Sequence, residues 1–420
     1  MPKVSLYFEL HQPYRLAPYS IFEVGRNHEY FSTKSHDSNR EVFTKVALKS
    51  YIPMLSLLLN LTKQYKEFVW AFSCSGIFLE QAETYVPEVL DLLQELLRTR
   101  QVEVLAETYY HSLASLYSSQ EFFQQVDLHS KKIVEFFGVK PTVFRNTELI
   151  YSDAIASLVG EMGYTGILTE AVDRYLEGQK RTQLFSSYSA KRLPLMLKHS
   201  QLSDDIAFRF SDKSWVSYPL KAETYVHWLN EYQQNEIVNL FMDFETFGEH
   251  QWGETGIFDF FQHVVHQFIQ YEWNQFVTPS QAMQLTDARK LPLYKVAEPI
   301  SWADIDRDLS AWRDNELQHD TLRLIYELES QVKATNDKQL LHDWRKLQTS
   351  DHFYYMCVKW SADGDVHAYF SPYENPMDAY VRFTTVLADI QSRISQYQAK
   401  PSRVRSMKSL KKRAPEFIQY

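Results

Sequence analysis

The chain has 420 residues, and 44 Lys and Arg against 53 Asp and Glu give a formal net charge of −9 at pH 7. Hydrophobic residues make up 45% and charged residues 23%, which excludes a disordered or collagen-like chain. The acidic balance argues against broad nucleic-acid binding. The two cysteines, Cys74 and Cys357, exclude a disulfide framework and a structural zinc site made of thiolates.

Glycine and aromatic residues both depart from average usage. The chain has 11 glycines, and they form neither of the common phosphate-binding loop motifs, so nucleotide cofactors are not expected. The 63 aromatic residues, 15% of the chain, fit either a large packed core or a sugar-binding cleft.

The start of the chain indicates a cytoplasmic protein. Met1-Pro2-Lys3-Val4 leads directly into a strand-like segment rather than into a signal peptide. No apolar run approaches the ~18 residues that a membrane-spanning helix needs. We therefore expect a cytoplasmic location and no membrane partner.

Short apolar runs alternate with helical patterns over the first ~245 residues, as they do in parallel βα units. The runs predict strands at residues 4–10, 68–73, 102–106, 142–146, 166–169, 194–198 and 238–243. One intervening helix begins at a capping box, Ser118-x-x-Glu121, and ends at Gly138. Seven strand–helix repeats fit either a parallel barrel or a doubly wound sheet.

Polar and ionisable residues gather where these strands end. They are His11-Gln12-Pro13, Ser75-Gly76, Glu107, Asn146-Thr147-Glu148, Glu170 and Asp243-Phe244-Glu245. In a parallel barrel all of these ends share one face, which is the face that carries the active site. Solvated loop charges would give a similar scatter, but the density of acidic residues favours a site.

The pattern changes near residue 280. Helical runs occupy residues 317–332, 338–349 and 376–398, interrupted by a predicted β-hairpin of residues 356–360 and 366–370 around Asp363-Gly364. We predict a catalytic domain over residues 1–280, a mostly helical domain over 281–399 that completes the active site, and a basic tail over 400–420. Such a tail is usually a solvated terminus.

Two carboxyl groups are candidates for glycoside cleavage, which needs one group to attack the anomeric carbon and another to donate a proton. Glu148 follows the fourth predicted strand, and Asp243 ends the seventh. Both have apolar sequence neighbours, a setting that shifts carboxyl pKa values. A pair of structural carboxylates, one of them paired with Arg145, would show the same pattern.

The remaining polar candidates are less specific. His11 could contact a sugar hydroxyl, ligate a metal or simply have its hydrogen bonds satisfied by neighbouring residues at the rim of the barrel. Glu245, Glu249 and His250 are close in sequence but lack the paired histidines of zinc helices. The tryptophans Trp70, Trp252, Trp302 and Trp312 could stack on sugars, although burial in the core is their commoner fate.

Five segments in chain order together resemble the motif regions of glycoside hydrolase family 57, and the closest branch is the α-amylase type. The segments are His11-Gln12-Pro13-Tyr14-Arg15, Ser75-Gly76-Ile77-Phe78-Leu79-Glu80, Phe144-Arg145-Asn146-Thr147-Glu148-Leu149, Phe241-Met242-Asp243-Phe244-Glu245-Thr246-Phe247-Gly248-Glu249-His250 and Ser301-Trp302-Ala303-Asp304.

The resemblance implies an α/β fold, an incomplete seven-stranded (β/α) parallel barrel followed by a mostly α-helical C-terminal domain. It implies retaining hydrolysis of α-1,4-glucans, with Glu148 as the nucleophile and Asp243 as the acid/base. The sugar sites would be lined by His11, Glu80, Glu245, Trp302 and Asp304. The scheme requires no metal and no cofactor.

The fifth region departs from the family pattern. Ala311-Trp312-Arg313-Asp314-Asn315 carries a charged pair where the family is expected to have an apolar residue and glycine, which affects distant sugar contacts. A 4-α-glucanotransferase or a branching enzyme would differ from a hydrolase only in the acceptor. The residues also leave open a metal-dependent hydrolase or deacetylase and an inactive glucan-binding protein.

Overall fold

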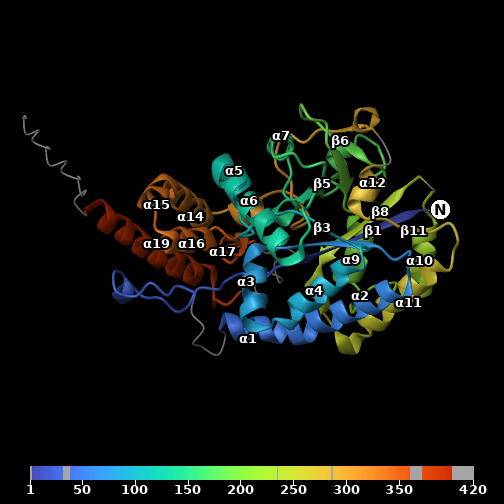
Figure 1. Cartoon of the computed structure of the whole chain (residues 1–420), viewed down its shortest axis with the longest axis horizontal. Helices are drawn as coiled ribbons and strands as arrows, with labels where there is room; N and C mark the ends of the chain where they lie inside the picture. The colour runs from blue at the N-terminus through green and yellow to red at the C-terminus, as the bar shows by residue number, and fades with distance from the viewer. Residues whose placement is uncertain (1, 32–37, 234, 285–286, 360–370, 400–420) are drawn as a thin grey trace, which may run out of the picture.

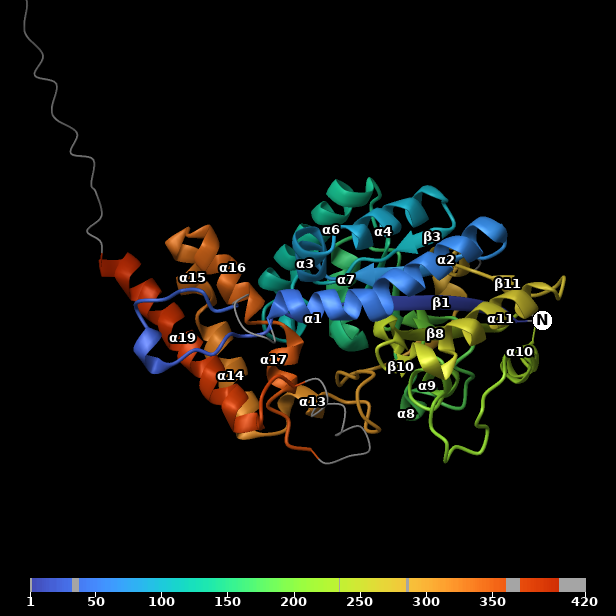
Figure 2. The same ribbon diagram turned by 90° about the horizontal axis from the view of Figure 1, so that it is seen from below.

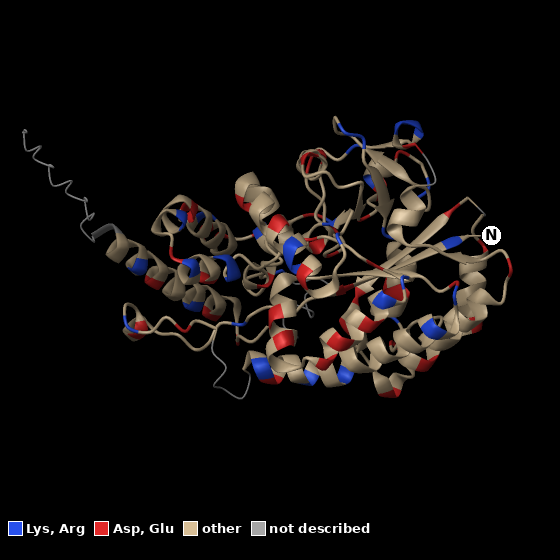
Figure 3. Cartoon of the chain, in the orientation of Figure 1, with Lys and Arg blue, Asp and Glu red and all other residues tan. Residues whose placement is uncertain are grey.

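The computed structural model describes residues 2–31, 38–233, 235–284, 287–359 and 371–399. The molecule is elongated, with a barrel of strands and helices at one end and a group of C-terminal helices at the other (Figure 1). Figure 3 shows Lys and Arg interspersed with Asp and Glu along the outer helices.

All seven predicted strands form, and they are parallel. They are β1 (Lys3–Leu10), β2 (Trp70–Cys74), β3 (Val102–Val104), β4 (Val143–Arg145), β5 (Gly166–Thr169), β7 (Pro194–Leu197) and β8 (Ile237–Asp243). The predicted α/β barrel is thus confirmed.

The strands form two ladders that join at two seams. One ladder runs β8–β1–β2–β3 and the other β4–β5–β7. A single bridge from Ala106 to Phe144 links β3 to β4. Between β7 and β8, Asn239 donates its side-chain amide to the Leu197 carbonyl over 2.8 Å and accepts the His199 N–H over 2.8 Å. The barrel therefore closes through isolated contacts at these seams.

Five short strands were not predicted from the sequence. They are β6 (Phe185–Ser187), β9 (Phe247–Gly248), β10 (Gln251–Trp252), β11 (Gln275–Phe276) and β12 (Leu293–Tyr294). Strand β6 is antiparallel to β7, and β12 extends that sheet. Runs of two or three residues show too little alternation to be recognised.

The helices cover the barrel and build the second region. The α-helices are α1 (Asn39–Val46), α2 (Ile52–Gln64), α3 (Gly76–Tyr85), α4 (Glu88–Arg98), α5 (Ala114–Tyr117), α6 (Ser119–Phe137), α7 (Asp153–Glu161), α8 (Asp173–Leu176), α9 (Ser200–Ala207), α10 (Ala222–Asn230), α11 (Ile257–Ile269), α12 (Pro279–Met283), α13 (Ser310–Arg313), α14 (Glu316–Glu327), α15 (Glu329–Thr335), α16 (Lys338–Lys346), α17 (Ser350–Tyr354) and α19 (Pro376–Ala399). Helix α6 has the predicted boundaries, because the Ser118 hydroxyl accepts the Glu121 N–H over 3.1 Å and Gly138 ends it at φ 70°.

Shorter helical turns complete the outline. They are η1 (Ile21–Glu23), η2 (Ala47–Tyr51, a π-turn), η3 (Thr147–Leu149), η4 (Phe244–Thr246), η5 (Gly253–Thr255) and η6 (Ala288–Lys290). With η2 inserted, α1 and α2 form one helix, Asn39–Gln64, whose 26 residues are long and apolar enough to cross a membrane by length and composition alone. Half of its most apolar window is buried, and it packs in the core outside the barrel.

Successive side chains of each barrel strand point alternately to the core beneath the covering helices and to the core inside the barrel. On β1, Val4, Leu6 and Phe8 belong to the core beneath the covering helices, whereas Tyr7 belongs to the cluster inside the barrel. Each of the seven strands contributes at least one residue to this inner cluster, within the strand or directly after it, and the residues nearest the carboxyl rim are Tyr7, Ala71, Leu105, Val143, Leu168, Met196 and Phe241. The inner layer therefore plugs the barrel below its carboxyl rim.

The C-terminal helices share a second core with residues of β4, β5 and β7, and the N-terminal part of the chain also enters it. Leu16 and Tyr30, from the segment after β1, share this core with α14, α16 and α19. Asp389 of α19 accepts hydrogen bonds from the Gly25 N–H at 2.5 Å and from the Tyr30 hydroxyl. Figure 2 shows this loop lying along α19.

Residues between the barrel and these helices still contact the barrel. Strand β12 pairs with β6, and Ile300 forms a bridge with Tyr151. The predicted domain boundary at residue 280 stays a prediction. The predicted hairpin falls largely on residues 360–370, and the basic tail on residues 400–420, which are outside the described residues.

Candidate active site

A ring of polar side chains lies at the carboxyl rim of the barrel. Side chains alternate along a strand, so the residue two positions after each inner-core residue also faces inward. These residues are Glu9, Ser73, Glu107, Arg145, Glu170, Lys198 and Asp243. A cavity of about 1500 Å³ opens at this rim, and its walls include Glu9, Lys198 and Asp243.

Glu148 reaches the cavity from a strained turn just after β4. Its backbone has φ 57° and ψ 26°, a left-handed conformation that non-glycine residues seldom adopt. The Asn146 side-chain amide donates to the Ile150 carbonyl over 3.0 Å and closes the turn. Such strain persists only where the surroundings enforce it, which is common at functional sites.

Three donors from distant parts of the chain converge on the Glu148 carboxylate. The indole N–H of Trp302 donates to Oε2 over 2.8 Å. The Ser350 hydroxyl donates to Oε1 over 3.1 Å, and Nε2 of His111 lies 3.4 Å from the same oxygen. The carboxylate is therefore fixed in one orientation before any substrate binds.

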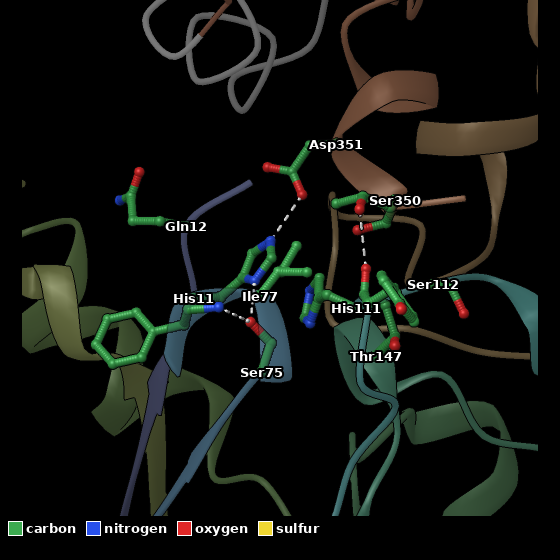
Figure 4. Close-up of polar contacts among 12 residues, drawn as sticks. His11, Gln12, Ser75, Ile77, His111, Ser112, Thr147, Ser350 and Asp351 are labelled. Carbon is green, nitrogen blue, oxygen red and sulfur yellow. Dashed lines mark hydrogen bonds and ion pairs between the residues drawn. The ribbon is translucent and has the colours of Figure 1, made fainter. Parts of the chain in front are cut away.

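Two stacked histidines lie beside Glu148. The rings of His11 and His111 are 3.9 Å apart and 21° from parallel. His11 Nε2 lies 3.0 Å from Asp351 and its Nδ1 lies 2.8 Å from the Ser75 hydroxyl (Figure 4). Because the pKa of Asp351 is lowered and its carboxylate only accepts, Nε2 of His11 donates to Asp351, and Nδ1 of the neutral ring accepts from the Ser75 hydroxyl.

The two histidines have opposite pKa shifts. Burial, together with the neighbouring His111, lowers the pKa of His11. Burial alone would also lower the pKa of His111, but Glu9, Glu107 and Glu148 outweigh it and raise that pKa well above its usual value. A neutral imidazole therefore stacks on a charged one, and the charged ring faces Glu148.

The pKa values of Glu148 and Asp243 are also shifted in opposite directions. Burial alone would raise the pKa of Glu148, but the hydrogen bond and charge of His111, with Arg145, lower it below its usual value. Burial, followed by repulsion from Glu148, raises the pKa of Asp243 to about 6. One carboxyl is thus held ionised while the other keeps its proton into the mildly acidic range.

Three other predicted sugar-binding residues, Glu245, Asp304 and Trp302, line the same cavity. Burial and the nearby Asp243 raise the pKa of Glu245 to about 8, and the Tyr51 hydroxyl donates to it. Trp302 has Arg145 and Lys198 at 5.0 and 5.3 Å from its ring centre. Trp302 thus holds the nucleophile candidate as well as lining the cavity.

Glu80 and Glu249 lie away from these groups. Glu80 accepts a hydrogen bond from the Tyr109 hydroxyl at 2.8 Å and faces His342 and Lys346 of α16, at 3.6 and 3.7 Å. It is absent from the cavity wall, so the structure gives it an ion-pairing position between α3 and α16. Its predicted sugar contact stays a prediction. Glu249 pairs with Lys49 at 3.4 Å instead.

Glu9, Glu107 and His111 are the group in the described residues that could hold a metal ion, because their ligand atoms all lie within 4.8 Å of one another. Arg145 forms an ion pair with Glu9 in the same cluster. A cation would have to displace this buried guanidinium or share the carboxylates with it, so the donor set fits a metal poorly.

Three residues of the site carry no motif that we recognised: His111, Ser350 and Asp351. A usable sign of His111 was its position four residues after Glu107, directly beyond a strand end. Ser350 and Asp351 begin α17, which the Ser350 N–H anchors to the His111 carbonyl over 2.9 Å. Nothing in the local sequence pairs residue 350 with residue 148, because only tertiary packing brings them together.

Comparisons with known proteins show what the chain is similar to. Residues 5–297 match the family model described as glycosyl hydrolase family 57. A protein of Methanocaldococcus jannaschii named "Putative alpha-amylase" is 37% identical over 408 residues, covering 94% of this chain and 86% of that protein. A family 57 branching enzyme from Thermococcus kodakaraensis has TM-score 0.68 at 13% identity, covering 95% and 92% of the two chains. An α-amylase from Thermotoga maritima has TM-score 0.59 at 11% identity, covering 94% and 96%.

Proposed function

Because the chain belongs to glycosyl hydrolase family 57 and is a glycoside hydrolase, we propose that it cleaves α-1,4-glucans with retention of configuration. Glu148 is the nucleophile and Asp243 the acid and base in this proposal. The supporting observation is the opposite pKa shift of two carboxyl groups that face one cavity. Acid-assisted cleavage of a glycosidic bond needs one ionised and one protonated carboxyl at the start of the cycle, and the separation of the two groups distinguishes retention from inversion.

The first step forms a covalent glucosyl-enzyme. Asp243 donates its proton to the bridging oxygen while a Glu148 oxygen attacks the anomeric carbon, so the carbon–oxygen bond breaks as the ester forms. The hydrogen bonds from Trp302 and Ser350 keep the attacking carboxylate in place. The charged His111 keeps it unprotonated.

The second step uses the same groups in reverse. Asp243, now ionised, removes a proton from water, and the resulting oxygen attacks the anomeric carbon and releases Glu148. The carboxyl groups should lie ~5–5.5 Å apart, the spacing of retaining enzymes. Glu245, with its raised pKa, is protonated near neutral pH and can donate to a sugar hydroxyl.

The test is incubation of the wild-type protein with maltooligosaccharides, followed by NMR of the newly formed reducing ends and chromatography of product lengths. Retention predicts that the α-anomer appears first, and Glu148→Gln should abolish turnover. Products longer than the substrate would instead identify a glucanotransferase or branching enzyme, which shares the first step and uses a sugar acceptor. Initial release of the β-anomer would contradict the mechanism.

A further inference from the structure

A second hollow, of about 580 Å³, lies between α9 and α10 on the outside of the barrel. Its walls include Trp215, Trp228, Tyr232 and Arg209. We propose that this hollow is a distal subsite for the α-glucan chain, which binds sugar residues remote from the two carboxyl groups. The proposal rests on the proposed function and deepens it, because it makes long polymers the favoured substrates.

The aromatic groups of the hollow suit a sugar ring. Trp215 and Trp228 are half-buried, and their ring centres lie 6.3 Å apart at an angle of 69°. Among the described residues, neither indole N–H has a protein acceptor. An indole offers an apolar face for the C–H surface of a glucosyl unit and a donor for its hydroxyls. Two such rings at an angle give a wall that a curved glucan chain can follow.

The polar side of the hollow is already ordered. Arg209 Nε donates to Asp205 over 2.7 Å, and its Nη2 donates to the Gln201 carbonyl over 3.0 Å. Asp205 is buried. The guanidinium also lies 5.8 Å from the ring centre of Trp215. A donor that is held in place loses little conformational freedom when it binds a hydroxyl group.

Arg209 joins the hollow to the catalytic cavity, because it lines both. On the cavity side the wall continues with Phe208, Tyr218 and Trp252, which are 54%, 40% and 56% exposed. Large aromatic side chains that stay exposed at a rim commonly mark a binding surface. Through Arg209 this aromatic part of the cavity wall adjoins the hollow that contains Trp215.

A purely structural role for these tryptophans is the competing explanation, because both pack against the core outside the barrel. The test therefore separates stacking from packing. We compare Trp215→Ala/Trp228→Ala with Trp215→Phe/Trp228→Phe, and we use Trp273→Ala as the matched control. Trp273 is 50% exposed and lines neither the hollow nor the cavity.

Binding to amylose is measured by affinity electrophoresis with variants that also carry Glu148→Gln. Turnover of amylose and of maltotriose is measured with variants that retain Glu148. The alanine pair should weaken amylose binding and kcat/KM by about 10-fold, with a much smaller change on maltotriose. The phenylalanine pair should restore most of the loss, and the Trp273 control should match the parent protein. Equal losses on both substrates, or no rescue by phenylalanine, would overturn the proposal.

A second variant covers the case in which the alanine pair folds poorly. Val216 lines the hollow and is 94% exposed, so Val216→Arg should leave the core intact while it adds a bulky side chain at the edge of the hollow. It should lower amylose binding, and unchanged binding would count against the subsite. The failure of the proposed function can be told apart from the failure of the subsite. If the protein cleaves no maltooligosaccharide but its amylose binding still depends on the two tryptophans, the proposed function is refuted and the subsite is not.

Discussion

The turn after β4 and the end of β8 each place a carboxyl group in one cavity, and the two groups differ in how they are held. Glu148 is oriented by Trp302 and Ser350 and faces a charged imidazole. Asp243 continues an ordinary strand, in register with Glu9, and the described residues supply its side chain with no hydrogen bond. Position along the chain does not determine the role of a carboxyl group; its neighbours do.

The difference sets the pH range of activity. Glu148 must be ionised to attack, and its lowered pKa puts that requirement below the usual carboxyl range. Asp243 must be protonated, and that form is lost as pH rises through about 6. We expect kcat/KM to be greatest at pH values between the pKa of Glu148 and the pKa of Asp243, and to fall on either side of this range.

The largest expected effect removes the oriented carboxylate. Glu148→Gln keeps the shape of the side chain but has no nucleophilic oxygen, so kcat should fall on the order of 10⁴-fold or more. In Glu148→Gly, added azide should restore part of the activity, since a small anion can occupy the vacated space. Activity of Glu148→Gln within tenfold of wild type would remove Glu148 from its role.

The next effect removes the proton donor. Asp243→Asn should lower kcat/KM on maltooligosaccharides by about 10²–10⁴-fold. The loss should be much smaller on a 4-nitrophenyl maltoside, whose leaving group needs little protonation. The decline of activity above pH 6 should also disappear. An equal loss on both substrates would argue for a structural role of Asp243.

A smaller effect is expected from a variant that makes the pKa values of the two carboxyl groups more alike. His111→Gln removes the charge that lowers the pKa of Glu148, so this pKa should rise toward or above its usual value. The acidic limb of the kcat/KM profile should then shift to higher pH, and the maximum should fall by about tenfold. The measurement is the full pH profile, since a general loss of packing would lower activity without moving the limb.

The smallest effect concerns a carboxyl group outside the cavity. Glu80→Gln should cost about 1 kcal/mol of unfolding free energy, because it breaks the contacts with His342 and Lys346. The folded state lowers the pKa of Glu80, so its stabilisation is present above the usual value of 4.5 and is lost as pH falls through the lowered one. The difference in melting temperature between wild type and Glu80→Gln should therefore be largest at pH 7 and should shrink as the pH is lowered below 4.5. A large rise in KM would return Glu80 to the sugar sites.

The barrel strands were predictable because their apolar runs are bounded by helical patterns. The inner rim was also within reach of sequence reasoning, since Phe241-Met242-Asp243 and Tyr7-Phe8-Glu9 repeat one spacing from an inner-core residue to a charged one. That spacing would have added Arg145 and Lys198 to the predicted site. Strands of two residues, such as β11, have no pattern of their own and arise from pairing with a neighbour.

The contacts that join the two regions were beyond sequence reasoning. Ser350 and Asp351 reach the site from α17, and their sequence neighbours form an ordinary short helix. Glu80 shows the reverse case, because its segment has the expected motif while the fold directs the side chain to α16. A motif identifies a segment, and only packing determines where each side chain points.

The position of α17 late in the chain also has a consequence for biosynthesis. Glu148 and Asp243 leave the ribosome more than a hundred residues before Ser350 and Asp351 do. Until then the nucleophile lacks one of its donors and His11 lacks its acceptor. A chain synthesised only as far as residue 349 would therefore hold both reacting groups in an incomplete arrangement, and we expect full activity to require that α17 has been made and packed.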